Sequence, residues 1–317
     1  MGLLSFLFGE NTSAEKQQAA QEKKNFEILK YDGIRARNMR QLPYAIKCFE
    51  QAVALEEDPE TLQLLANAYM ESDRLPEART TLERLSGNTP DDIKVWLSLA
   101  HLCYMQADYS AMDSYSQKAI QLDDKHAAAY YLAGKAAYAL HNELQAIVML
   151  TKSILFDENE LSAYLLRAEV LWSMRQAKDA LEDIEKILAQ APEQEDALLL
   201  KAQIELATGN ATEAVASLKR VVEANPFQEK AYLLQAEAYV QQNQLDEAVN
   251  LLGEALEVMP QSALLYQERG RIYLLKGEKE KSVEDVKKAI ELNPEGEKQI
   301  SGNYDNFSEQ TQGPGIY

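Results

Sequence analysis

The sequence predicts an all-α protein built as a solenoid of stacked helix pairs, and three observations support that prediction. The 317 residues include only 13 Gly and 9 Pro, which is little turn chemistry for a many-stranded sheet. Prolines recur in one phase of a 34-residue period, and self-similarity at such a period is typical of repeat proteins. Small and large residues also recur, each at fixed positions of this period. The prolines are Pro90, Pro192, Pro226, Pro260 and Pro294.

Aligned on this period, residues 26–296 divide into eight units, and only the first interval is 33 residues long. Length alone suggests about two domains. The period instead predicts one array of repeats. Its units begin at Phe26, Pro59, Ile93, Ala127, Leu161, Glu195, Glu229 and Ala263.

Each unit is predicted to contain a helix, a short turn and a second helix. Apolar residues recur at helical spacing over positions 4 to 11, and the pattern restarts after a break at position 15. Gly209, Asn243 and Gly277 at that break suit the left-handed residue that ends a helix. Pro43 and Pro76, at position 18, suit the first turn of the second helix.

The two helices of a unit are expected to pack closely because small residues occupy fixed positions. Position 20 is small in all units except the third, which has Met112. Large residues at positions 4 and 24, such as Trp96 and Phe49, surround these small positions. A small residue lets two helix axes approach. Position 8 is always small: Gly33, Ala66, Ala100, Gly134, Ala168, Ala202, Ala236 and Gly270.

Taken together, these positions closely resemble the tetratricopeptide repeat family over residues 26–296. The third unit departs from the pattern with Met112 and Ser116 at positions 20 and 24, so its local packing is expected to differ. The resemblance implies a right-handed superhelical α-solenoid of eight helix-turn-helix repeats. It also implies a concave groove lined by the first helix of each unit.

Residues 1–25 are interpreted as an apolar segment followed by a leader helix, and residues 297–317 as a flexible polar tail. Thr12 and Glu15 can form a capping box, which predicts a helix start there. No Gly or Pro follows until Gly33, so we expect the leader to continue into the first repeat helix and to cover its open face.

Composition and charge exclude several classes of protein. A hydrophobic content of 46% favours a folded chain, and a net charge of −19 repels phosphate backbones, so nucleic acid is not an expected partner. Cys48 and Cys103 are too few for a disulfide framework. With neither an ordinary signal peptide nor an apolar stretch long enough to span a bilayer, a soluble cytoplasmic protein is expected.

No catalytic residue, metal site or cofactor is predicted. His101, His126 and His141 occur at different phases of the repeat, without metal-ligand neighbours at helical spacing. Acidic clusters such as Asp179-Glu182-Asp183-Glu185 fall on second helices, where a solvated acidic face is the expected explanation.

Binding in the groove is therefore the predicted function, at positions 5, 9 and 12 of the first helices. A strip of apolar and aromatic side chains there exceeds what a monomer usually exposes. The carboxylate clamp known in the family is not matched, because Lys30 at position 5 is accompanied by Ile34 at position 9. The predicted groove residues are Leu97, His101, Tyr104, Tyr131, Lys135, Tyr138, Leu165, Glu169, Trp172, Leu199, Gln203, Leu206, Leu233 and Glu237.

The leading interpretation is a non-catalytic scaffold, adaptor or chaperone-like protein that binds a peptide or helix of a partner. Residues 195–262 contain 11 acidic and 4 basic side chains, so a ligand with apolar anchors and basic flanks would suit them. Two alternatives stay open. One is a membrane-peripheral assembly factor that docks through the apolar residues 3–8. The other is an enzyme that uses a groove carboxylate such as Glu169.

Overall fold

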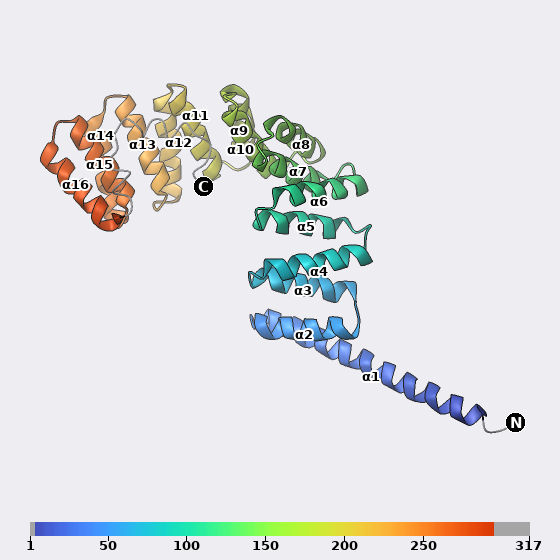
Figure 1. The fold of residues 1–317 in the computed structure, drawn as a ribbon. Helices are drawn as coiled ribbons and strands as arrows, with labels where there is room; N and C mark the ends of the chain where they lie inside the picture. Colours follow the sequence, from blue (N-terminus) through green and yellow to red (C-terminus); the bar gives the residue numbers. More distant parts are fainter. Residues whose placement is uncertain (1–3, 295–317) are drawn as a thin grey trace. The chain divides into compact units, whose positions relative to one another are not determined.

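The structure, a computed structural model, describes the backbone of residues 4–294 and the side chains of residues 16–294. Within that range every regular element is an α-helix, and short turns join successive helices (Figure 1). The helices are α1 (Leu4–Asn38), α2 (Leu42–Leu55), α3 (Pro59–Glu71), α4 (Leu75–Asn88), α5 (Ile93–Met105), α6 (Tyr109–Leu122), α7 (Ala127–Ala139), α8 (Glu143–Phe156), α9 (Leu161–Ser173), α10 (Ala177–Gln190), α11 (Glu195–Ala207), α12 (Ala211–Ala224), α13 (Glu229–Gln241), α14 (Leu245–Val258), α15 (Ala263–Leu275) and α16 (Lys279–Leu292).

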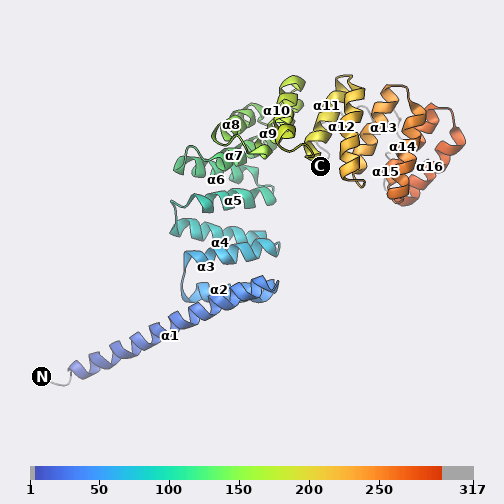
Figure 2. The same cartoon turned by 180° about the vertical axis from the view of Figure 1, so that it is seen from behind.

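The helices form consecutive pairs, as the repeat pattern predicts. From α3 onward, every odd-numbered helix begins at the first position of a unit, and the following even-numbered helix packs against it. The chain divides into two compact units, residues 1–160 and residues 161–317, which we call the N-terminal and C-terminal units. In the N-terminal unit, α3 to α8 lie in successive layers in both views (Figures 1 and 2).

The turn within each repeat has one repeated backbone geometry. The residue at position 15 has a positive φ in all eight repeats, including Arg40, Ala107 and Arg175, where the sequence offers no glycine or asparagine. The N–H of the next residue donates to the carbonyl of position 11, as from Asn142 to Ala137 at 2.9 Å. This bond closes the first helix in the Schellman manner and turns the chain into the second.

The small residue at position 8 lies directly beneath the large residue at position 24. A Cβ added to Gly33 would lie 2.5 Å from the ring of Phe49, and one added to Gly134 would lie 2.7 Å from Leu150 Cγ. These distances are far inside van der Waals contact. The predicted close approach of the paired helices is therefore confirmed at these two repeats.

The third repeat reaches the same packing with exchanged volumes. Met112 and Ser116 are both fully buried, and the Ser116 hydroxyl donates to the Met112 carbonyl oxygen at 2.8 Å. The larger Met at position 20 thus accompanies a small residue at position 24. A volume-conserving exchange of this kind keeps a core well packed.

In the C-terminal unit, two repeats bury an ion pair between their helices. Arg167 of α9 donates two hydrogen bonds to Asp183 of α10, at 2.7 and 2.6 Å. Arg269 of α15 donates two to Asp285 of α16, each at 2.7 Å. Both aspartates are buried, so the prediction that Asp183 belongs to a solvated acidic face was wrong. The sequence pattern did not reveal that Arg167 faces Asp183 across the helix pair.

Two further expectations, both about the N-terminal leader, were wrong. Helix α1 begins at Leu4, so the predicted start at Thr12 to Glu15 is wrong; no proline precedes that sequence to stop a helix. As predicted, the leader continues into the first repeat helix without a break. The helix is one continuous rod that does not fold back (Figure 1). Residues 16–25 are all exposed, so this part of the leader covers no open face. The predicted tail at 297–317 lies outside the described residues.

Candidate functional site

All the predicted groove residues lie on odd-numbered helices, the first helix of each repeat. We use the term first-helix face for the side chains at positions 5, 9 and 12 of those helices. In the N-terminal unit, α5 contributes Leu97, His101 and Tyr104, and the neighbouring α7 contributes Tyr131, Lys135 and Tyr138. In the C-terminal unit the predicted residues are distributed over α9, α11 and α13.

Three of the predicted residues in the N-terminal unit form a cluster. The Lys135 ammonium nitrogen lies 3.6 Å from the ring centroid of Tyr104 and 6.0 Å from that of Tyr131. Tyr104 is 38% exposed, and Tyr131 and Lys135 are half-buried. A cation above a tyrosine face is attracted by the ring quadrupole. The cluster therefore joins α5 to α7 and presents aromatic edges and an ammonium group to solvent.

The first-helix face of the C-terminal unit is only partly available. Leu165, Glu169 and Trp172 of α9 are half-buried, as are Gln203 of α11 and Leu233 and Glu237 of α13. Leu199 and Leu206 are different, because they are 6% and 5% exposed and belong to the hydrophobic core. These two leucines hold α11 in the stack and offer almost no surface to a partner.

Glu237 lies beside a buried ion pair that was not predicted from the sequence. Arg271 of α15 donates to both carboxylate oxygens of Glu268, at 2.9 and 2.6 Å, and Glu268 is only 4% exposed. Burial first, and then the negative charge of Glu268, raise the pKa of Glu237; Arg271 opposes the shift. The spacing of three between Glu268 and Arg271 on one helix is the signal that would have identified the pair.

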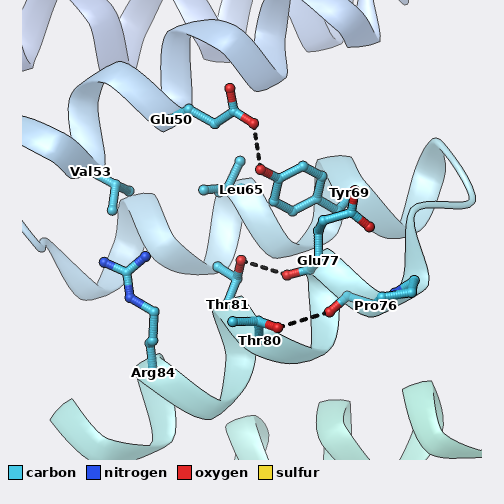
Figure 3. Close-up of a pocket in the computed structure, with 9 residues that line it drawn as sticks. All are labelled: Glu50, Val53, Leu65, Tyr69, Pro76, Glu77, Thr80, Thr81 and Arg84. Carbon is cyan, nitrogen blue, oxygen red and sulfur yellow. Dashed lines mark hydrogen bonds between the residues drawn. The ribbon is translucent and has the colours of Figure 1, made fainter.

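A pocket of the N-terminal unit lies elsewhere, among α2, α3 and α4 (Figure 3). In it the Tyr69 hydroxyl donates to Glu50 at 2.6 Å, and burial together with this carboxylate raises the pKa of Tyr69 to about 12. None of the predicted groove residues lines it. The lining residues are Glu50, Val53, Leu65, Tyr69, Pro76, Glu77, Thr80, Thr81 and Arg84.

The described residues include neither a cluster of metal-ligand side chains nor a helix suited to crossing a bilayer. Among residues 4–294, no group of three or more His, Cys, Asp or Glu side chains is arranged to hold a metal ion. Over the same range, no helix combines the length and the apolar composition needed to cross a bilayer.

Comparison with known families gives four matches, all to tetratricopeptide repeat models. They cover residues 40–102, 165–229, 236–277 and 263–295. No curated protein has a sequence that matches the chain.

Solved structures share the fold at low sequence identity. A tetratricopeptide repeat protein from Parabacteroides merdae is 16% identical with a TM-score of 0.61, covering 84% of this chain and 99% of that one. PilW, described as a widely conserved type IV pilus biogenesis factor, is 17% identical with a TM-score of 0.58, covering 64% and 94%. PilF of Pseudomonas aeruginosa is 15% identical with a TM-score of 0.56, covering 68% and 99%.

Proposed function

Because the chain belongs to the tetratricopeptide repeat family, we propose that it is a non-catalytic scaffold that binds a peptide or helix of a partner protein. Proteins of this family generally serve as interaction scaffolds. We further propose that residues 26–296 form eight repeats and that residues 1–25 form a leader. The binding surface is assigned to the first-helix faces of the repeats.

One observation supports this assignment most directly: large aromatic side chains on the first-helix faces are held in place but not fully buried. Tyr104 is 38% exposed, and Tyr131, Tyr138 and Trp172 are half-buried. Aromatic side chains that are already ordered lose little entropy on binding and supply most of the energy at many interfaces. A partner that covers them gains contact area without reorganising the helices.

The two units differ in the charge that accompanies these aromatics, and this suggests how a partner is selected. In the C-terminal unit, Glu237 and Glu268 share one guanidinium, that of Arg271, so the surroundings keep a net negative charge. A basic side chain of a partner would offset it. This supports a ligand whose apolar anchors are flanked by basic residues for the C-terminal unit.

Affinity capture with the full chain tests the proposal. The double variant Tyr138→Ala/Trp172→Ala removes one aromatic side chain from each unit, and it should lose at least about 90% of the captured partner because such anchors are often worth about 2 kcal/mol each. Partner recovery is measured by quantitative mass spectrometry, and far-UV circular dichroism verifies that helix content is unchanged.

Tyr44→Ala is the matched control, because Tyr44 is a 53% exposed tyrosine on the second helix of the first repeat. It should capture the partner as well as the unaltered chain does. If the double variant captures the partner as well as Tyr44→Ala does, the first-helix faces are not the binding surface and the proposal fails.

A further inference from the structure

We propose that the pocket among α2, α3 and α4 binds an arginine side chain of a partner protein and that Glu50 is the carboxylate that pairs with its guanidinium group. The pocket lies within the N-terminal unit. None of its lining residues occupies position 5, 9 or 12 of a first helix, the positions to which the proposed function is assigned. The inference therefore goes beyond the proposed function and does not depend on it.

The first argument is the shape of the pocket, which has a volume of about 450 Å³. Small-ligand sites usually have volumes of about 300–1,000 Å³. Val53, Leu65 and Tyr69 in the pocket are buried, whereas Glu50 and Arg84 are exposed (Figure 3). The pocket therefore has an apolar floor and a mouth open to solvent. It can take one long side chain while the backbone of the partner stays outside.

The second argument is that Glu50 lacks a cationic partner. Its carboxylate accepts a hydrogen bond from the Tyr69 hydroxyl at 2.6 Å, and among the described residues no cation forms an ion pair with it. Lys47, one turn earlier on α2, is exposed and makes no ion pair with it. The neighbouring arginines already have carboxylate partners of their own. The pairs are Arg74 with Glu77 and Arg84 with Glu57.

The third argument comes from the same place one repeat later, where the chain itself supplies the groups that the pocket lacks. Glu83 is the equivalent of Glu50, because both occupy position 25 of their repeats. Glu83 accepts hydrogen bonds from the Tyr115 hydroxyl at 2.9 Å and from Arg79 at 3.0 Å. Tyr115 is at position 23 of the third repeat, and its ring spans the space between the helices to reach Glu83.

At the pocket, both of these groups are replaced by residues that cannot do the same. Position 23 of the second repeat is Thr81, whose short side chain leaves open the space that Tyr115 fills. Position 21 of the first repeat is Ile46, where the second repeat has Arg79. An arginine of a partner supplies both features, because its methylene stem packs on the apolar floor and its guanidinium forms charge-assisted hydrogen bonds with Glu50. The net charge of −19 also favours the approach of a basic segment.

The test is a nuclear magnetic resonance titration of the full chain, labelled at its Leu and Val methyl groups, with a capped pentapeptide that has one arginine between glycines. The methyl signals of Val53 and Leu65 should shift, because these residues line the pocket. A peptide with citrulline in place of arginine is the matched ligand, since it has the same shape without the charge. Its affinity should be at least about fivefold lower.

Three variants complete the experiment. Glu50→Gln keeps an acceptor for the Tyr69 hydroxyl but removes the charge, so it should lower the affinity for the arginine peptide by at least about fivefold. Glu158→Gln, at an exposed position in the turn after α8, makes the same change in charge and should leave binding unaltered. Thr81→Tyr places the residue of the third repeat in the pocket and should abolish the methyl shifts. Far-UV circular dichroism verifies that each variant is folded.

Three results would overturn the inference. They are the absence of methyl shifts with the arginine peptide, equal affinities for arginine and citrulline, and arginine binding that survives Glu50→Gln. If Thr81→Tyr does not fold, the comparison of Glu50→Gln with Glu158→Gln decides.

A last arm of the titration uses N-acetyl-arginine amide. Shifts with this compound but none with the peptide would assign the pocket to a free small molecule and overturn the assignment to a partner protein. All of these failures leave the scaffold proposal standing, because that proposal is tested on the first-helix faces by the Tyr138→Ala/Trp172→Ala variant.

Discussion

The N-terminal and C-terminal units fill the same position between paired helices with different chemistry. At position 7 of its second, third and fourth repeats, the N-terminal unit has Leu65, Leu99 and Ala133, all buried. The four repeats of the C-terminal unit have polar residues at that position: Arg167, Lys201, Gln235 and Arg269. One backbone frame therefore accepts either apolar packing or a buried ion pair, provided that the partner at position 23 matches.

The first-helix faces differ in a parallel way. The first-helix faces of α5 and α7 carry three tyrosines and one lysine without any acid, whereas α13 and α15 carry Glu237 beside the Glu268–Arg271 pair. Because the backbone frame is the same, the repeat itself specifies no ligand charge. Under the proposed function, the side chains on each unit would do so, and this makes the comparison between units testable by substitution.

The largest effect on stability is expected when one member of a buried ion pair of the C-terminal unit is removed. Asp285→Ala leaves the Arg269 guanidinium, which is 21% exposed, without its bidentate partner. Loss of one member of a buried pair leaves an uncompensated charge, so the free energy of unfolding should fall by about 2–4 kcal/mol. Urea unfolding followed by circular dichroism measures the change, and hydrogen exchange places it in α15 and α16.

Thr81→Ala is the control at the equivalent position 23 of the N-terminal unit, where the Thr81 hydroxyl bonds only to the Glu77 carbonyl. Its loss should be about 1 kcal/mol or less. The double variant Arg269→Leu/Asp285→Leu should recover most of the stability, because an apolar pair can replace an ionic one. Equal losses for Asp285→Ala and Thr81→Ala would show that the two units do not differ in this respect.

A smaller effect on stability is expected at position 15, where the two units share one backbone conformation. Ala107 in the N-terminal unit and Arg175 in the C-terminal unit both occupy position 15 with φ values of 55° and 64°. A side chain in this left-handed region is strained, so Ala107→Gly and Arg175→Gly should each raise the free energy of unfolding by about 0.5–1 kcal/mol.

The reverse change, Gly209→Ala at φ 83°, should lower stability by a similar amount. Thermal melts of the three variants suffice to check the signs. Destabilisation by both glycine substitutions would contradict the strain assigned to position 15, and opposite signs would mean that the two units do not share it.

The smallest effect on stability concerns its dependence on pH, through the Glu237 carboxyl group of the C-terminal unit. Folding raises the pKa of Glu237 above its ordinary 4.5. The stability contributed by its protonated form is therefore fully present below about pH 4.5 and is lost as the pH rises through the raised pKa. At pH 7, Glu237→Gln should stabilise the protein by less than about 1 kcal/mol and reduce the pH dependence above pH 4.5.

Urea unfolding at several pH values measures this dependence. Part of it should persist, because burial also raises the pKa of Glu205. Glu247→Gln, at an exposed position on α14, serves as the control and should leave the profile unchanged. A Glu237→Gln variant with the unaltered profile would contradict the assigned surroundings of Glu237.

Much of the fold could be predicted because local patterns and repeat packing agree. The small residue at position 8 and the large residue at position 24 predict a contact that the structure places at Gly134 and Leu150. The turn was predicted from residues such as Gly209 and Gly277. Ala107 and Arg175 adopt the same conformation because the hydrogen bonds that end the helix outweigh the strain of a single residue.

The candidate site was less predictable, because exposure depends on neighbouring helices. Leu199 and Leu206 occupy the same positions as Leu97 and Tyr104, yet they are buried in the core of the C-terminal unit. The sequence did not predict which charged side chains form ion pairs either. Asp183 is one of four acidic residues within a short stretch, and only the facing Arg167 distinguishes it from the exposed Glu182.

The sequence by itself determined the all-α repeat architecture, the helix pairing and the helices on which the candidate surface lies, because these follow from spacing along one chain. Tertiary structure decided which side chains on those helices reach solvent and which charges are paired. Those properties depend on distances between residues of different helices, such as the 3.6 Å from Lys135 to the Tyr104 ring. A periodic pattern places residues on a face, but burial and electrostatics depend on what the adjacent helix brings to that face.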